Sequence, residues 1–179
     1  IAREHNLLVP LLHSFFAYGL TLTGKGNYDA ALATFEEGLD LSKKVGNEVY
    51  HHRLLNGLGW LYIEVGDLDH ALGLNRQSAE GARKRGDHEV IANAELNLGD
   101  IFLAKGDLAL AQESLDGVYR LVNDPATSDW QKWRYSTHLF ASLGELRLAR
   151  GEPGQAREFA DQCLDLATRT NSRKNLVKA

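Results

Sequence analysis

The chain of 179 residues contains no methionine, one cysteine and three prolines. Its single cysteine, Cys163, excludes an internal disulfide and a pair of cysteine metal ligands, so we expect a reducing, cytoplasmic setting. Positive and negative charges nearly balance, with a net charge of -4, and this excludes the basic surface that nucleic-acid binding requires. The sequence contains no run of eighteen apolar residues, and we therefore expect no membrane-spanning helix.

What the sequence does contain is a regular spacing of glycines. Gly59 is followed seven residues later by Gly66, then directly by Asp67, and five residues after the second glycine by Ala71. The same spacing recurs three times, at Gly19/Gly26/Asn27/Ala31, Gly99/Gly106/Asp107/Ala111 and Gly144/Gly151/Glu152/Ala156. Eight of the seventeen glycines lie in these two columns, and such strict repetition indicates a repeat architecture.

Helical periodicity between the glycines predicts pairs of helices joined by short turns. The expected helices cover residues 8–23, 28–45, 48–65, 68–85, 88–105, 108–122, 129–150 and 153–169. Turns such as Gly46-Asn47 combine a glycine that ends one helix with a polar residue that begins the next. Ser128 and Gln131 form a capping box, so we expect the seventh of these helices to begin early, near Asp129.

The helix pairs form units over residues 7–46, 47–86, 87–127 and 128–170 of a single domain. Residues 1–5 are interpreted as the last turn of an earlier helix that ends at Asn6, and residues 172–179 as the start of another. Because the chain begins at Ile1 and has no methionine, we expect it to be a fragment of a longer protein.

Glycines inside four helices need a packing reason, since each costs about 1 kcal/mol relative to alanine. Without a Cβ, the two helices of a pair can approach closely. We expect the small alanine of the second helix to provide the facing surface in each pair, which gives the pairs Gly19/Ala31, Gly59/Ala71, Gly99/Ala111 and Gly144/Ala156.

Large residues flank the helical glycines in further columns, with Tyr18, Leu58, Leu98 and Leu143 before them and Leu22, Tyr62 and Phe102 three residues after. This pattern resembles the tetratricopeptide repeat, with departures at Glu95, Arg147 and Asn75. The resemblance implies an all-α, right-handed α-α superhelix of about four helix hairpins with partial helices at both ends. The fourth unit is similar to repeats in bacterial signalling ATPases, cyclases and transcriptional regulators.

The resemblance also implies which residues line a concave groove for a partner. They are His13, Phe16, Leu20, Arg53, Asn56, Trp60, Glu64, Asn93, Asn97, Asp100, His138 and Glu145. Phe16 and Leu20 stand where other members carry the Lys and Asn of a carboxylate clamp, so that mode is not expected. Trp60 beside Arg53 is the expected anchor, and the acids Asp100 and Glu145 favour a partner with an apolar anchor and basic residues. Alternatively, Trp60 packs against the neighbouring repeat and the acids are solvated.

Motifs for chemistry are weak in this sequence. Gly24-Lys25-Gly26 lacks the spacing of a phosphate loop, and the adjacent His51-His52 point about 100° apart on a helix, which disfavours a metal site. Cys163 falls in a column of small residues and is expected to be a buried thiol. Trp130 and Trp133 either form an exposed contact surface or, as we favour, fold over the end of the preceding helix.

The sequence therefore predicts a protein-interaction or scaffold module, not an enzyme, that binds a protein or peptide within a larger bacterial signalling protein. We expect no cofactor, no metal, and no direct contact with nucleic acid or membrane. Self-association through the exposed repeat ends is a further expectation. The alternative is an inducer-sensing domain of a transcriptional regulator, which a closed pocket among Arg53, Trp60, Asn93 and Asn97 would favour.

Overall fold

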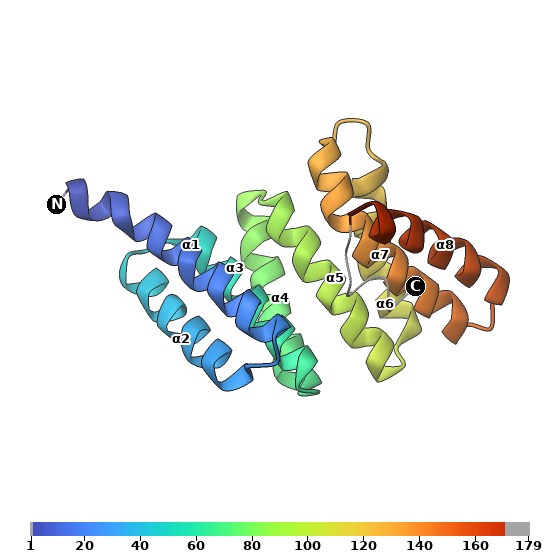
Figure 1. Ribbon diagram of the computed structural model, residues 1–179, viewed down its shortest axis with the longest axis horizontal. Coiled ribbons are helices and arrows are strands. Elements are labelled where there is room, and N and C mark those ends of the chain that lie inside the picture. Colours follow the sequence, from blue (N-terminus) through green and yellow to red (C-terminus); the bar gives the residue numbers. More distant parts are fainter. Residues whose placement is uncertain (1, 171–179) are drawn as a thin grey trace. The chain divides into compact units, whose positions relative to one another are not determined.

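A computed structural model describes residues 2–170, with side chains from Leu7 onward. The described residues form eight helices joined by turns (Figure 1): α1 (Ala2–Gly24), α2 (Tyr28–Lys44), α3 (Glu48–Glu64), α4 (Leu68–Arg85), α5 (His88–Lys105), α6 (Leu108–Asn123), α7 (Asp129–Ala149) and α8 (Pro153–Thr170). The predicted bounds of α2 to α8 are confirmed to within one residue. The predicted turn at Asn171-Ser172 and the partial helix over 172–179 lie outside the described residues.

Helix α1 differs from the prediction because it is continuous from Ala2 to Gly24. The predicted turn at Asn6, and with it the separate helix over residues 1–5, is wrong. Six of the seven turns between the described helices contain a glycine with positive φ, a conformation that costs glycine little. Asn6 has no such glycine beside it, and the fixed φ of Pro10 is compatible with a helix that continues past it.

Polar side chains begin most helices as the sequence predicts. Asn47, Asp67 and Asp107 each accept a hydrogen bond from the backbone N–H three residues later. Ser128 does the same for Gln131 at 3.4 Å, and α7 therefore begins at Asp129, as expected. Asn27 is the exception among the predicted caps, because its side chain makes no capping bond.

Two compact units divide the chain within α5, one up to Ala94 and the other from Glu95 onward. In the first unit, α1 packs on α2, α2 on α3 and α3 on α4, and α1 also contacts α3. In the second unit, α6 packs on α7 and α7 on α8. Helices α1 and α3 are thus neighbours, and together they present the surface on which the candidate site of the first unit lies. The predicted single domain and unit boundaries stay a prediction.

The helical glycines make room for a large side chain of the second helix. A Cβ added to Gly19 would lie 2.6 Å from the ring of Phe35, and one added to Gly99 would lie 2.6 Å from Leu115. Both large side chains are completely buried. They lie four residues beyond the expected alanine on the same helix face, and their greater length lets them reach the glycine. The expectation that alanine faces these two glycines is therefore wrong.

The other two helical glycines differ from each other. Gly59 lies against the amide of Asn75, a buried residue that stands where Phe35 stands in the first hairpin. At Gly144 the expected partner is present, because the nearest atom to an added Cβ is the backbone oxygen of Ala156 at 3.5 Å. The alanine interpretation thus holds for the last hairpin and fails at Gly59 as well.

One stretch of α1 departs from the prediction of no membrane-spanning helix. Residues Leu7–Gly24 have a mean hydropathy of 1.4 over 18 residues, and by length and composition alone this helix could cross a membrane. A core helix of a soluble protein passes the same test. Only 22% of this stretch is buried, however, so α1 exposes an unusual amount of apolar surface.

Candidate functional site

The groove stripe of α1 carries three of the predicted partner-binding residues. His13 is exposed, and its ring meets the edge of the Tyr50 ring at 6.2 Å between centroids. The Tyr50 hydroxyl lies 3.4 Å from His13 Nδ1. Phe16 and Leu20 are half-buried and pack on the hydrophobic core of the first unit. His13 is therefore accessible, while Phe16 and Leu20 form the apolar floor beside it.

Arg53 is held at the surface of α3 by two partners. Its Nη2 donates to Glu89 Oε2 at 2.7 Å, and its guanidinium lies over the Tyr50 ring at 5.7 Å from the centroid. The Nε atom of Arg53 is buried without a hydrogen-bond partner. The predicted groove residues His13 and Arg53 are thus brought together through Tyr50, a residue that the prediction did not include.

Asn56 is not available to a partner, although the sequence predicted it at the groove surface. Its side chain is buried, and its amide donates to Asn75 Oδ1 at 2.9 Å. Asn75 in turn donates to the backbone oxygen of Ala71 at 2.9 Å. Because Asn75 replaces an apolar residue in this column, its polar atoms need a buried partner, and Asn56 supplies one.

Trp60 lies at the other end of the same surface of α3. Its indole N–H donates to Glu64 Oε1 at 2.8 Å, one helical turn later. A Cβ added to Gly24 would lie 3.7 Å from the indole, so the ring contacts the end of α1. Trp60 is half-buried by this contact, which agrees with packing against a neighbouring repeat and leaves part of the ring exposed.

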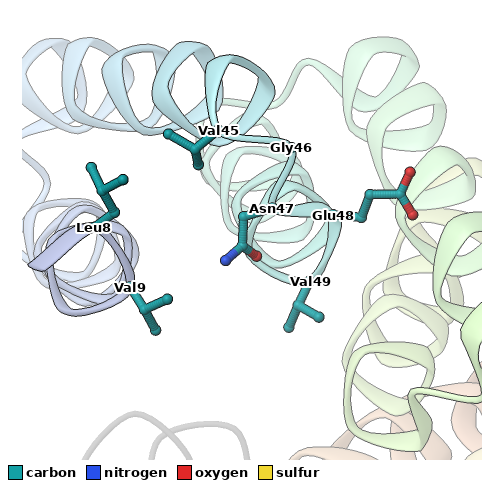
Figure 2. Close-up of a pocket in the computed structure, with 7 residues that line it drawn as sticks. All are labelled: Leu8, Val9, Val45, Gly46, Asn47, Glu48 and Val49. Carbon is teal, nitrogen blue, oxygen red and sulfur yellow. The ribbon is translucent and has the colours of Figure 1, made fainter. Parts of the chain in front are cut away.

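A cavity of about 440 Å³ lies where the first turn of α3 approaches α1. It is lined by Leu8 and Val9 from α1, Val45 and Gly46 from the end of the first hairpin, and Asn47, Glu48 and Val49 from the beginning of α3. Figure 2 shows the Glu48 carboxylate pointing away from Leu8 and Val9. The lining is therefore mainly aliphatic, with polar groups at the α3 side.

The sequence prediction missed this cavity although a signal for it was present. Val9 lies four residues before His13, and Val49 lies four residues before Arg53. Residues four apart share a helix face, so both valines extend the groove positions by one turn. We call Val9, His13, Phe16 and Leu20 of α1, with Val49, Arg53 and Trp60 of α3, the groove face.

Three predicted residues in the second unit form a polar contact between α5 and α7 or lie near it. His138 Nε2 lies 2.8 Å from Asp100 Oδ2, and the Ser142 hydroxyl donates to Asp100 Oδ1 at 2.5 Å. A serine nucleophile needs the histidine against its hydroxyl, whereas here the carboxylate lies between the two groups. Asp100, His138 and Ser142 therefore brace two helices and do not form a nucleophilic triad. Glu145 is exposed on α7.

The two predicted asparagines of α5 differ in exposure. Asn93 is half-buried, and its side-chain amide donates to the backbone oxygen of Glu89 one turn earlier, at 2.9 Å. Asn97 is buried, so the expectation that it faces a partner is not met. Its position relative to the apolar columns of α5 explains this, because Leu96 and Leu98 on either side are buried as well.

Trp130 and Trp133 are more exposed than we expected from the sequence. About half of each residue is accessible, 54% of Trp130 and 48% of Trp133. The favoured interpretation, in which both rings fold over the preceding helix, is therefore wrong. They lie in the first two turns of α7, before the region in which the α7 side chains become buried from Tyr135 onward.

The adjacent histidines of α3 contact different neighbours, as their angular separation predicts. His51 Nδ1 lies 3.1 Å from the Ser42 hydroxyl of α2, and His52 Nδ1 lies 2.7 Å from Arg85 Nη1 of α4. No group of three or more potential metal-binding side chains occurs among the residues that the structure describes. The two histidines instead connect α3 to the helices on either side of it.

Acidification is expected to weaken the α2–α3 contact through His51. Burial lowers the pKa of His51 below 6.5, the charges of His52 and Lys43 act in the same direction, and Glu48 opposes them. Because the unfolded chain then binds a proton that the folded chain excludes, the free energy of unfolding falls as the pH drops below about 6.5. Urea unfolding of wild type and His51→Gln between about pH 8 and about pH 5 measures this effect. The variant should lose less stability than the wild type, and equal losses would contradict the assignment.

Cys163 is buried, as the sequence predicted. Its thiol donates to the backbone oxygen of Thr137 at 3.3 Å, which fixes α8 against α7. A buried thiol held in this way is a packing element, because thiolate chemistry needs an exposed and electropositive environment.

Comparison with known proteins supports a repeat protein. Residues 11–84 match the model of the tetratricopeptide repeat family. A search of curated proteins finds no match. Among solved structures, the crystal structure of BtubC (BKLC) from P. vanneervenii is similar, with a TM-score of 0.67 and 20% identity. The match covers 90% of this chain and 65% of that one, so this chain spans less than two thirds of the length of that protein.

At this identity the structural likeness shows the fold alone, and it supports the predicted α-α solenoid of helix hairpins. The family match adds a functional class, because tetratricopeptide repeats are generally scaffolds for protein–protein interaction and are typically not catalytic. Residues 11–84, which include most of the groove face, thus carry the sequence of a tetratricopeptide repeat.

Proposed function

We propose that this chain is a protein-interaction module that binds an extended peptide or a partner domain along the groove face of the first unit. The observation that carries this proposal is the aliphatic cavity at one end of the groove face, with the half-exposed Trp60 at the other end. An apolar cavity and an aromatic ring on one surface are the features that anchor most interfaces. His13 and Arg53 lie between them and supply polar contacts.

The expected ligand carries an apolar anchor with a basic residue nearby. The cavity accepts a branched aliphatic or aromatic side chain, and its lining supplies no cation. Glu48 beside the cavity and Glu64 beside Trp60 are both exposed carboxylates. They favour a positively charged neighbour of the anchor through charge complementarity. Asp100 contributes less than the sequence suggested, because both of its oxygens contact His138 and Ser142.

Selection of displayed random peptides on the whole chain tests this proposal. We expect enriched peptides to share an apolar residue next to a basic one. Val49→Asp or Trp60→Ala should weaken binding by about tenfold or more, which corresponds to about 1.4 kcal/mol. Val49 lies in the first turn of α3, where an acidic residue is compatible with the helix, so this variant should fold. Trp133→Ala is the matched control and should bind normally. Peptides that bind both groove variants as tightly as wild type would refute the proposal.

The alternative is a sensor of a small molecule, as in an inducer-binding domain of a transcriptional regulator. The cavity volume of about 440 Å³ favours it, because pockets for small ligands span about 300–1,000 Å³. Free leucine and free tryptophan are suitable probes in thermal unfolding experiments. Saturable stabilisation that Val49→Asp abolishes and Trp60→Ala leaves unchanged would favour the sensor, because Trp60 does not line the cavity.

The cellular setting belongs to the same proposal. We place the module in the regulatory part of a larger bacterial signalling protein in the cytoplasm. Its support is the similarity of the fourth unit to repeats in such proteins and the single, buried cysteine.

A further inference from the structure

A second apolar surface of α1 lies on a different side of the helix from the groove face. Leu7, Leu11, Ser14 and Tyr18 follow one another at spacings of four, three and four residues, which places them on one side of the helix. We call these four residues the outer stripe. Leu7 is 70% exposed and Tyr18 is 59% exposed, so the outer stripe is open in the described structure.

The repeat shows what covers the equivalent surface of α3. Forty residues after Leu11, Ser14 and Tyr18 stand His51, Leu54 and Leu58. Both leucines are buried. The covering helix is α2, because a Cβ added to Gly38 would lie 2.9 Å from Leu54, and Ser42 of α2 contacts His51.

The same surface of α7 is covered in the second unit. The residues at the matching positions, 125 after Ser14 and Tyr18, are Leu139 and Leu143, and both are buried. Helix α6 packs on α7, and Arg150 of α7 donates to Gln112 of α6 at 2.8 Å. In each unit, therefore, the second helix of a hairpin covers this surface on the first helix of the next hairpin.

Helix α8 is a second helix of the same kind and presents an exposed leucine. The surface of α2 that meets α3 includes Phe35 and Ser42, with Leu39 between them on the same side of the helix. Leu39 corresponds to Leu164 of α8 by the same offset of 125. Leu164 is 46% exposed, so α8 carries an uncovered apolar residue where α2 carries part of its contact surface.

We propose that the outer stripe of α1 binds α8 of a second copy of this chain. Such a contact repeats, between two molecules, the interface that each unit already makes within one molecule. It joins two different surfaces, α1 on one copy and α8 on the other, and a contact of that type does not close on itself in a pair. The chain therefore assembles head to tail into oligomers whose size grows with concentration.

Substitutions at the two surfaces test the proposal, with mass in solution measured by light scattering over a wide concentration range. The wild-type mass should rise with concentration. Leu11→Glu blocks the α1 surface and Leu164→Glu blocks the α8 surface, and each variant alone should be monomeric. Leu148→Glu is the matched control, because Leu148 is exposed on α7 outside both surfaces, and this variant should assemble like the wild type. Circular dichroism verifies that every variant remains helical.

Mixing the two blocked variants gives the decisive result. Each retains the surface that the other lacks, so an equimolar mixture should form a dimer and nothing larger. A wild-type chain that is monomeric at every concentration overturns the proposal. So does a wild type that Leu11→Glu renders monomeric while Leu164→Glu has no effect, because that outcome shows α1 pairing with α1. Monomeric wild type that binds phospholipid vesicles through Leu11 would instead identify the outer stripe as a membrane surface.

Discussion

Replacing Phe35 with alanine is expected to lower the free energy of unfolding by about 3–5 kcal/mol, as for other large aromatic residues removed from a protein core. Phe35 is completely buried and belongs to the hydrophobic core of the first unit. Its ring occupies the space that two glycines leave open, because a Cβ on either Gly19 or Gly57 would lie 2.6 Å from the ring. Loss of the ring leaves a cavity against backbone on both sides, and backbone cannot move in to fill it.

Urea unfolding followed by circular dichroism measures this loss for Phe35→Ala. Tyr119→Ala is the control, since Tyr119 is an aromatic residue of a second helix that is exposed. The control should lose less than about 1 kcal/mol, as is usual for substitutions at the surface. A loss for Phe35→Ala no larger than that of the control would show that the glycine–phenylalanine contact does not hold the hairpin together.

Alanine at Gly99 and at Gly144 should change stability in opposite directions, although both glycines occupy the same column. At Gly99 the added Cβ would lie 2.6 Å from Cδ2 and 2.8 Å from Cγ of the buried Leu115. Cγ is the branch point of the side chain and cannot swing away, so overpacking should cost about 1–3 kcal/mol. At Gly144 the nearest atom is 3.5 Å away, and helix propensity should stabilise the chain by about 1 kcal/mol.

Thermal and urea unfolding of Gly99→Ala and Gly144→Ala provide the comparison. A double-mutant cycle with Leu115→Ala isolates the contact, because removal of the leucine side chain removes the clash. In that background Gly99→Ala should no longer destabilise the chain. If both single variants shift stability in the same direction, the glycines are not packing elements of the kind described.

Local features of the fold could be predicted from the sequence, and features that depend on two helices could not. Gly46 and Gly86 mark turns because each adopts positive φ, which is a property of the residue itself. The neighbour of Gly59 is Asn75 rather than Ala71 because of how two helices are placed against each other, which no spacing within one helix specifies. The same limit concealed the turn-free path of α1 through Asn6, where the local signal was weak.

The candidate site shows the same division. The periodicity of α3 placed Arg53 and Trp60 on an accessible surface, and the structure leaves both partly exposed. The burial of Asn56 depends on Asn75, which lies 19 residues later on another helix. The cavity needs Val45 at the end of the first hairpin together with Val9 of α1, and their approach is a property of the folded chain.

Chemical-shift mapping by NMR tests the central claim most directly, with a peptide selected on the chain as the ligand. Addition of the peptide should shift the backbone amide signals of Val9, His13, Val49, Arg53 and Trp60. The signals of Trp130 and Trp133 in the second unit should stay in place. Shifts confined to residues outside the groove face, with Val9 and Val49 unchanged at saturation, would contradict the proposed binding surface.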